Sequence, residues 1–252
     1  MSTMLPASFL DRPIAHRAYH DIAAGRPENS VEAIIAAIEA GYGIEIDLQL
    51  SSDGVAMVFH DYDLDRLTAE TGPVRARSAS ALGAIPLRHG SRGIPTFAEV
   101  LALVAGQVPL LVEVKDQDGA MGPDVGPLEA AAAEALNGYD GPVALMSFNP
   151  HSVAALAALA PGIPRGLTTC AYEGEDAEQL PEARLAGLRA IADFDRTGAC
   201  FISHDWRDLN APRVAELRAA GVPVLCWTVR SPEDEAVARA VANNITFEGY
   251  AA

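Results

Sequence analysis

Residues 43–50 alternate between apolar and polar side chains and read Gly43-Ile44-Glu45-Ile46-Asp47-Leu48-Gln49-Leu50. Successive side chains of a β-strand point to opposite faces, so this pattern predicts a strand with one apolar face and one face that carries two carboxylates. A strand at the protein surface would turn its polar face to water. In a parallel sheet covered by helices, the apolar face meets the helices instead, and Glu45 and Asp47 then point to the other side of the sheet.

The rest of the chain repeats short β-rich runs followed by amphipathic runs, which predicts a parallel sheet. Strands are predicted at residues 13–16, 43–50, 55–60, 109–115, 143–147, 165–169, 200–203 and 222–229. Eight strands in 252 residues favour an α/β fold of the TIM type, a closed (β/α)8 barrel, over an open doubly wound sheet. We therefore expect a single barrel domain over residues 1–252, with Glu45 and Asp47 pointing into the barrel.

Helices are predicted at residues 30–40, 97–104, 127–136, 151–160, 182–190, 212–220 and 232–241. Two of their starts carry the pattern of a capping box, Asn29 with Glu32 and Thr96 with Glu99. One stretch breaks the alternation of strands and helices. Residues 61–95 are polar and interrupted by Gly and Pro, with a short helical patch at residues 78–82, so we interpret them as a small insertion after the third strand.

A second predicted strand repeats the arrangement of carboxylates, since Glu113 and Lys115 share one face of Leu110-Leu111-Val112-Glu113-Val114-Lys115. Three inward carboxylates on two strands form a hard, oxygen-rich site of the kind that binds Mg²⁺ or Ca²⁺. Lys115 supplies a cation beside this site. The alternative is a structural ion pair inside the barrel, because isolated buried carboxylates are costly and normally titrate, pair or bind metal.

Two histidines end predicted strands, His16 followed by Arg17 and His60 followed by Asp61. The turn at residues 51–54 would pair the strands beside it, and with Leu50 opposite Val55 residue 45 would face residue 60. Two imidazoles, three carboxylates and two cations are suited to metal-assisted cleavage of a phosphodiester. The metal and cations neutralise charge on phosphoryl oxygens, and histidines exchange protons near neutral pH.

Composition narrows the class of protein. The chain carries 18 Lys and Arg against 34 Asp and Glu, a net charge of −16, and half of its residues are hydrophobic. This composition excludes intrinsic disorder and argues against nucleic acid and stable membrane association. The sequence shows neither a secretory leader nor an apolar run that spans a bilayer, and its three scattered cysteines are typical of a reducing compartment. We expect a cytoplasmic protein that recognises any phosphate through a few local cations.

An ordered set of motifs resembles the glycerophosphodiester phosphodiesterase family. The motifs run along the chain as Ile14-Ala15-His16-Arg17, Pro27-Glu28-Asn29-Ser30, Glu45-Ile46-Asp47, Ser52-Asp53-Gly54, His60-Asp61, Leu64-Asp65-Arg66-Leu67-Thr68, Ile94-Pro95-Thr96, Glu113-Val114-Lys115, Ser147-Phe148-Asn149-Pro150 and Trp227-Thr228-Val229. The chain departs from the family pattern at Ala18, where glycine is usual. It also has Glu248 near its end, where the family tends to have an aspartate-containing turn.

The resemblance implies a TIM barrel with a small insertion and the hydrolysis of glycerophosphodiesters to sn-glycerol 3-phosphate and an alcohol. By the same resemblance, one divalent cation, Mg²⁺ or Ca²⁺, is bound by Glu45, Asp47 and Glu113. The glycerol 2-hydroxyl attacks phosphorus, and water then opens the cyclic phosphate. The implied roles of the other residues are His16 and His60 as general base and general acid, Arg17 and Lys115 on the phosphate, and Trp227 as a wall for the glycerol backbone, while Glu28 supports Arg17 or His16.

Two other functions remain open at this point. A lysophospholipase-D-like enzyme would use the same site on a lipid-bearing substrate, with an apolar groove to which Tyr19, Phe148, Tyr172 and Trp206 could contribute. A catalytically silent phosphodiester-binding barrel would lack at least one of the two histidines or three carboxylates, and all five are present. The sequence leaves open the preferred alcohol, the metal and the oligomeric state.

Overall fold

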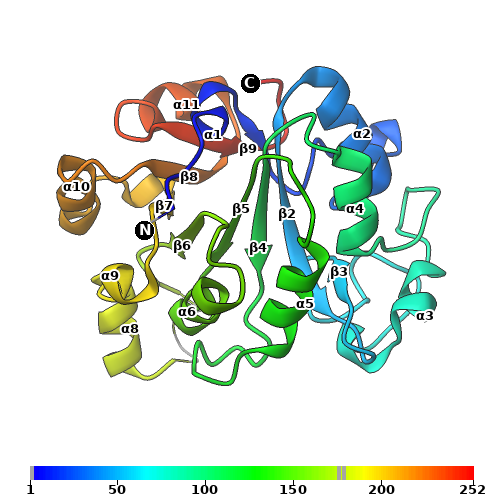
Figure 1. The fold of residues 1–252 in the computed structure, drawn as a ribbon. Helices are drawn as coiled ribbons and strands as arrows, with labels where there is room; N and C mark the ends of the chain where they lie inside the picture. Colours follow the sequence, from blue (N-terminus) through cyan, green and yellow to red (C-terminus); the bar gives the residue numbers. More distant parts are fainter. Residues whose placement is uncertain (1–2, 175–176, 178–179) are drawn as a thin grey trace.

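The computed structural model describes residues 3–174, 177 and 180–252. Within them, eight parallel strands pair side by side around a closed barrel (Figure 1). The strands of the barrel are β1 (Ile14–Ala15), β2 (Gly43–Leu50), β4 (Leu110–Val114), β5 (Val143–Ser147), β6 (Arg165–Thr169), β7 (Phe201–Asp205), β8 (Val224–Val229) and β9 (Asn244–Phe247). The circle closes because β1 pairs with β2 on one side and with β9 on the other. The predicted TIM-type barrel is therefore confirmed.

The third predicted strand lies outside this barrel. β3 (Ala56–Val58) runs antiparallel to β2, and Leu50 pairs with Ala56. The predicted register, with Leu50 opposite Val55, was wrong by one residue. The reason is Ser51, whose hydroxyl accepts the backbone N–H of Val55 and whose own N–H donates to the Val55 carbonyl, so that Val55 belongs to the turn. The eighth strand of the barrel is instead β9, which the sequence analysis missed.

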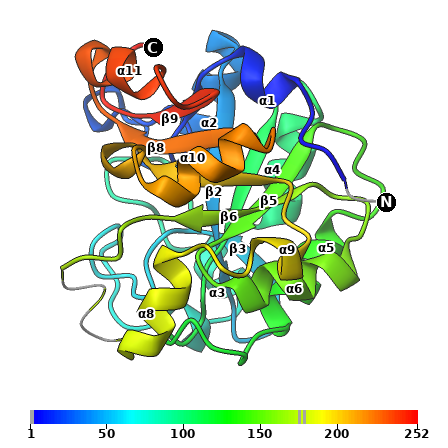
Figure 2. The same cartoon turned by 90° about the vertical axis from the view of Figure 1, so that its left-hand side faces the viewer.

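Helices cover the outside of the barrel (Figures 1 and 2). The longer ones are α2 (Val31–Ala40), α4 (Phe97–Val104), α5 (Pro127–Ala135), α6 (Pro150–Leu159), α8 (Glu182–Arg189), α10 (Pro212–Ala219) and α11 (Pro232–Ala238). The capping box of Thr96 and Glu99 is confirmed, whereas the one predicted for Asn29 and Glu32 was wrong because Ser30 caps α2. No described helix is long and apolar enough to cross a membrane.

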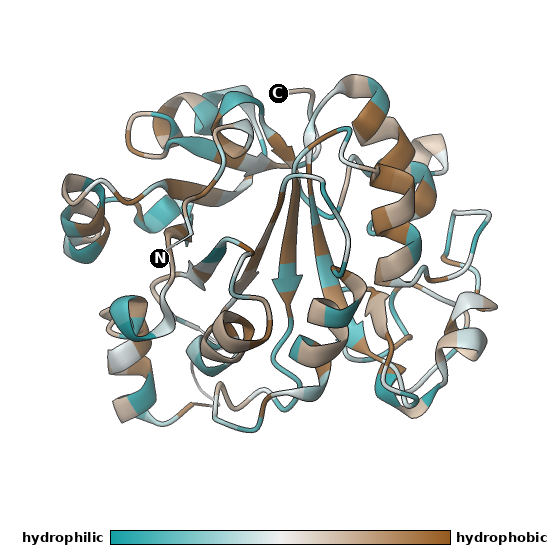
Figure 3. Ribbon diagram, viewed as in Figure 1, coloured by the Kyte–Doolittle hydropathy of each residue, from teal (hydrophilic) through white to brown (hydrophobic). Residues whose placement is uncertain are grey.

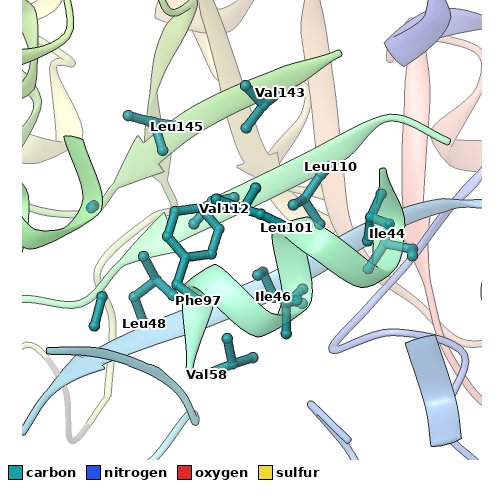
Figure 4. Close-up of a cluster of buried hydrophobic side chains, with 14 of the residues drawn as sticks. Ile44, Ile46, Leu48, Val58, Phe97, Leu101, Leu110, Val112, Val143 and Leu145 are labelled. Carbon is teal, nitrogen blue, oxygen red and sulfur yellow. The ribbon is translucent and has the colours of Figure 1, made fainter. Parts of the chain in front are cut away.

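The apolar faces of β2 and β4 pack against these helices. Figure 4 shows Phe97 and Leu101 of α4 over Ile44, Ile46 and Leu48 of β2, all of which are fully or almost fully buried. Val112 and Val114 of β4 belong to the same cluster. The helices therefore occupy one face of these strands, and the alternate side chains of β2 and β4 point into the barrel.

The two ends of the barrel differ in polarity. At the amino end, Leu5 and Phe9, the latter in the short helix α1 (Ser8–Asp11), pack with Leu111 and Phe201 from the barrel interior. At the other end, the colour of β4 turns to hydrophilic near its arrowhead (Figure 3). Carboxyl ends of parallel strands are where TIM barrels carry their active sites, so the polar end is where a site is expected.

The segment between β3 and α4 forms a small subregion of its own. It contains the 3-10 turn η2 (Val74–Ala76) and the short helix α3 (Ala79–Gly83), close to the helical patch predicted at residues 78–82. Its apolar cluster joins β3 to the segment and consists of Met57, Phe59, Leu64, Val74, Leu82, Ile85, Leu87 and Ile94. The segment is thereby fixed beside the carboxyl end of β2.

Candidate active site

Three buried carboxylates lie together at the carboxyl ends of two neighbouring strands. Glu45 and Asp47 come from β2 and Glu113 from β4, where Asp47 and Glu113 are paired in register. One oxygen of each carboxylate lies within 4.8 Å of the others, and the three residues are 2%, 1% and 6% exposed. Strand periodicity predicted that these side chains share the inside of the barrel, and the structure brings them together.

Two cations lie against this cluster. The Lys115 ammonium lies 2.8 Å from Asp47 Oδ1 and 2.5 Å from Glu113 Oε1, so it bridges the two strands. Arg17 Nε is 3.8 Å from Asp47 Oδ2, and the backbone N–H of Arg17 donates to Glu45 Oε2 at 2.8 Å. Lys115 thus forms ion pairs of the kind expected as the alternative to a metal site. The cluster nevertheless has three carboxylates against two cations, Lys115 and Arg17.

The charges in the cluster are distributed unequally. Burial alone would raise the pKa of Asp47, but Lys115 and Arg17 hold it well below its usual range. Burial would lower the pKa of Lys115, yet Asp47 and Glu113 raise it. Glu45 differs, because burial and the neighbouring charges of Asp47 and Glu113 all raise its pKa. A dication bound by the three carboxylates would stabilise the ionised form of Glu45, so this donor set fits a hard metal ion such as Mg²⁺ or Ca²⁺.

Asn29 orients one of the carboxylates. Its Nδ2 donates to Asp47 Oδ2 at 2.9 Å and its Oδ1 accepts the backbone N–H of Asp47 at 3.3 Å. Asn29 has a φ of 56°, a left-handed conformation that asparagine tolerates better than most residues. Its position before residues 30–40 predicted only a helix cap. Its place in the Pro27-Glu28-Asn29-Ser30 motif was the one feature of the sequence that indicated a role in the site.

His60 is held by residues of the segment between β3 and α4. Its Nδ1 lies 2.7 Å from Asp61 Oδ1, and Arg66 binds Asp61 through two hydrogen bonds of 2.7 Å each. The same guanidinium binds Glu28 through two hydrogen bonds of 2.8 Å, and Glu28 in turn accepts a hydrogen bond from Arg17 Nη1 at 2.8 Å. Arg66 therefore connects the histidine with the arginine beside the carboxylates.

His16 is held by residues that follow the last two strands of the barrel. Its Nδ1 lies 2.6 Å from Glu248 Oε2, just beyond the end of β9, and Arg230 Nε donates to Glu248 Oε1 at 2.7 Å. Burial lowers the pKa of His16 below 6.5, although the hydrogen bond with Glu248 opposes this shift. Asp47 interacts electrostatically with both His16 and His60. The carboxylate cluster is thus flanked by both imidazoles.

This arrangement agrees with what the comparisons with known proteins found. Residues 16–245 match the model of the glycerophosphoryl diester phosphodiesterase family. The chain belongs to this family. It is 27% identical over 90% of its length, and over 90% of the relative, to YhdW of Bacillus subtilis, a candidate glycerophosphodiester phosphodiesterase. It is 31% identical to a glycerophosphodiester phosphodiesterase of Caldanaerobacter subterraneus, over 56% of this chain and 60% of that one.

The fold agrees as well. A phosphodiesterase of Oleispira antarctica, whose structure holds the product sn-glycerol 3-phosphate, superposes with a TM-score of 0.75 at 25% identity. The superposition covers 96% of this chain and 94% of that structure. The likeness in fold therefore extends over nearly the whole chain.

In this member of the family, a cavity of about 290 Å³ opens beside the carboxylates. It is lined by His60, Asp61, Tyr62, Glu113, Lys115, Asp116, Met121 and Phe148. Trp227 borders it indirectly, since its ring meets the Phe148 ring edge-on at 5.4 Å while its Nε1 donates to the Ser203 carbonyl at 3.0 Å. Three of the eight predicted site residues therefore form the carboxylate cluster and four lie beside it, whereas Trp227 is separated from the cavity by the Phe148 ring.

The two departures from the family pattern also lie at this site. Ala18 follows Arg17 in a left-handed turn, with φ values of 51° for Arg17 and 65° for Ala18. This turn directs the backbone N–H of Arg17 toward Glu45. Glycine at residue 18 would adopt the same left-handed conformation without strain. Glu248 is the carboxylate that binds His16, a role that the resemblance to the family does not imply.

Proposed function

We propose that this protein hydrolyses glycerophosphodiesters to sn-glycerol 3-phosphate and an alcohol, with one divalent cation, Mg²⁺ or Ca²⁺. The observation that carries the proposal is the cluster of Glu45, Asp47 and Glu113, flanked by His16 and His60 and contacted by Lys115. Membership of the family and the product bound to the relative from Oleispira antarctica support the same reaction. A cytoplasmic location stays a prediction.

Different residues of the candidate site carry out different parts of the proposed reaction. Glu45, Asp47 and Glu113 would hold the metal, which would supply positive charge that stabilises the phosphoryl group as it reacts. Arg17 and Lys115 neutralise the charge that develops on the phosphoryl oxygens. His16 removes the proton from the glycerol 2-hydroxyl as its oxygen bonds to phosphorus, and His60 gives a proton to the alkoxide that leaves.

The second half of the reaction reverses these proton transfers. His60, now neutral, takes a proton from water as the water oxygen attacks the cyclic phosphate. His16, now protonated, returns its proton to the glycerol 2-oxygen as the ring opens. Both histidines are then back in their starting states, and the products are sn-glycerol 3-phosphate and the alcohol. The lowered pKa of His16 suits a residue that begins the cycle as a neutral base.

The size of the cavity bears on the choice of alcohol. At about 290 Å³ it lies just below the roughly 300–1,000 Å³ usual for small-molecule sites, which favours a small alcohol over a lysolipid. The apolar groove considered above is present only in part. Phe148 and Tyr172 lie together, with ring centroids 6.3 Å apart, whereas Tyr19 packs against Tyr42 and Phe247. Trp206 belongs to the apolar cluster outside β7 and β8.

A coupled assay for release of sn-glycerol 3-phosphate tests the proposal. The panel comprises glycerophosphocholine, glycerophosphoethanolamine, glycerophosphoglycerol and a lysophosphatidylcholine, each with EDTA, with Mg²⁺ and with Ca²⁺. We expect turnover of at least one water-soluble diester, loss of turnover in EDTA and recovery with one of the two metals. Activity on the lysolipid alone would favour the lysophospholipase-D-like function. Binding of the diesters without turnover under any condition would favour the catalytically silent barrel.

A further inference from the structure

Both histidines of the site are supported in the same way. In each case the ring Nδ1 lies within hydrogen-bond distance of a carboxylate whose other oxygen is bound by an arginine Nε. One set is His60, Asp61 and Arg66, with contacts of 2.7 and 2.7 Å. The other is His16, Glu248 and Arg230, with contacts of 2.6 and 2.7 Å. The second set is assembled from the two ends of the chain, since His16 and Glu248 are 232 residues apart.

Glu248 and Arg230 are placed side by side by the last two strands. The backbone N–H of Glu248 donates to the carbonyl of Val229, the last residue of β8, and Arg230 follows directly. The side chain of Glu248 is 18% exposed, whereas that of Arg230 is 60% exposed. Arg230 therefore binds the partly buried carboxylate while it remains largely exposed itself.

The chemistry of this contact defines a role for Glu248. Burial would raise its pKa, but hydrogen bonds from His16 and His20 and the charge of Arg230 hold the pKa well below its usual range. An ionised carboxylate only accepts hydrogen bonds, so His16 must carry its proton on Nδ1. The neutral ring then presents an unprotonated Nε2, which is the nitrogen that a general base needs. The carboxylate also stabilises the imidazolium that forms once the proton has been taken.

We propose, on the basis of the function proposed above, that Glu248 is the positioning residue of His16 and that Arg230 holds Glu248 in place. Glu248 fixes the tautomer and orientation of the ring. Arg230 keeps the carboxylate turned toward His16 although His20 offers a competing contact at 3.4 Å. Neither residue lines the cavity beside the carboxylates. Their effect is therefore on kcat through His16, with little effect on substrate binding.

The first test is kinetic and uses the reaction of the intact chain. Carboxylates that support a histidine are typically worth about 10–100-fold in activity, so Glu248→Gln and Glu248→Ala should lower kcat by this factor with KM within about twofold. Glu248→Asp should restore part of the loss. Arg230→Met should lower kcat by less and Arg230→Lys less again, because Arg230 acts through Glu248. The matched control is Arg213→Met, which removes an exposed arginine paired with Glu216 on α10 and should leave kcat unchanged.

A double-mutant cycle identifies the route of the effect. If Glu248 acts through His16, adding Glu248→Gln to His16→Ala should lower kcat no further. An equal loss in both backgrounds would overturn the proposal and give Glu248 a structural role. Wild-type kcat in both Glu248→Gln and Glu248→Ala would overturn it as well.

A spectroscopic test keeps the inference separate from the proposed reaction. The ¹⁵N chemical shifts of the histidine rings report the tautomer, and the His16 signal is assigned by its loss in His16→Asn. We expect the Nδ1–H form in the wild type and in Arg213→Met, and a mixture of tautomers in Glu248→Ala. An Nδ1–H form that persists in Glu248→Ala would contradict the inference even if the enzyme is active. Failure of the wild type to release sn-glycerol 3-phosphate would contradict the proposed function and leave this measurement valid.

Discussion

The Lys115 ammonium lies 2.8 Å from the Asp47 carboxylate and also contacts Glu113, so one cation joins the two strands that carry the candidate metal ligands. Lys115 is 14% exposed, and the paired carboxylates are less exposed still. Removing one partner of a buried ion pair costs about 3–5 kcal/mol because it leaves an uncompensated charge. The stability of this end of the barrel therefore depends on Lys115 when metal is absent.

Lys115→Met should consequently destabilise the protein in EDTA far more than in saturating metal. A dication provides the charge compensation that the variant lacks, so Mg²⁺ or Ca²⁺ should raise the Tm of Lys115→Met more than that of the wild type. Thermal unfolding followed by circular dichroism, with and without metal, measures this. Activity should also fall by about 10²–10³-fold, the usual loss when one charge-stabilising group is removed. Equal metal-induced shifts in both proteins would show that Lys115 and the metal do not share the cluster.

Metal affinity should rise with pH. The pKa of Glu45 is raised by burial and by Asp47 and Glu113, so this side chain retains a proton at pH values where an exposed glutamate has lost it. Metal binds the ionised form, and its binding must therefore release a proton at the lower pH values. Titration calorimetry with Mg²⁺ or Ca²⁺ in two buffers of different ionisation enthalpy should detect this release, and the number of protons released should fall as the pH is raised. Glu45→Gln should abolish the release, and its presence in that variant would assign the proton to another group.

Much of the fold could be predicted because several strands have two chemically distinct faces or clear boundaries. The predicted range of β2 agrees with the structure at both ends, and those of β5 and β6 do too. β9 was missed because it has four residues and carries Asn244 and Thr246 at alternate positions. Asn244 is buried all the same, since its Nδ2 donates to the carbonyls of Phe9 and Arg12 in the segment that covers the amino end of the barrel. Contacts of this kind leave no periodic pattern in a sequence.

The residues of the candidate site also differ in whether the sequence pattern could reveal them. Glu45, Asp47 and Glu113 could be found because strand periodicity alone puts their side chains on one side of two adjacent strands. Arg66 and Asn29 could not, because their partners Glu28 and Asp47 lie far away in sequence. Arg66 lies 38 residues from Glu28 and Asn29 lies 18 residues from Asp47. Their roles depend on the closure of the barrel and on the path of the segment after β3.

The acidic limb of the pH profile should report His16. Burial lowers the pKa of His16, the hydrogen bond with Glu248 opposes this, and the charge of Arg17 lowers it again, with a net fall below 6.5. A general base works in its neutral form, so kcat/KM should be at its plateau at neutral pH and fall only as the pH drops through a value below 6.5. His16→Ala should lower kcat by about 10²–10⁴-fold. A midpoint of this limb above 6.5 would exclude His16 as the base that titrates.

The role of His60 can be separated by the choice of leaving group. A general acid matters when the leaving alcohol is strongly basic, as choline or glycerol is, and matters little when the leaving group is p-nitrophenol. His60→Ala should therefore lose about 10²–10⁴-fold in kcat on glycerophosphocholine and regain most of this on the p-nitrophenyl ester of glycerol phosphate. His16→Ala should stay slow on both substrates because the attacking hydroxyl is unchanged. Similar losses for both variants on both esters would contradict the assignment of His60 as the general acid and His16 as the general base.

Arg66 should matter for catalysis more than for stability. It is 49% exposed, yet it binds Asp61 and Glu28 through paired hydrogen bonds and so supports His60 and Arg17 together. Arg66→Met should lower kcat by about 10–100-fold, as for other groups that orient a functional histidine, and should also raise KM because Glu28 loses a partner and holds Arg17 less firmly. Arg66→Lys should recover little, because an ammonium cannot bind two carboxylates through paired hydrogen bonds.

The control is Arg77→Met, which breaks the exposed ion pair with Glu70 in the same segment and should leave kcat and KM unchanged. Steady-state kinetics together with thermal unfolding of both variants tests this, and a large fall in the Tm of Arg66→Met without a change in kcat would make Arg66 a structural residue only.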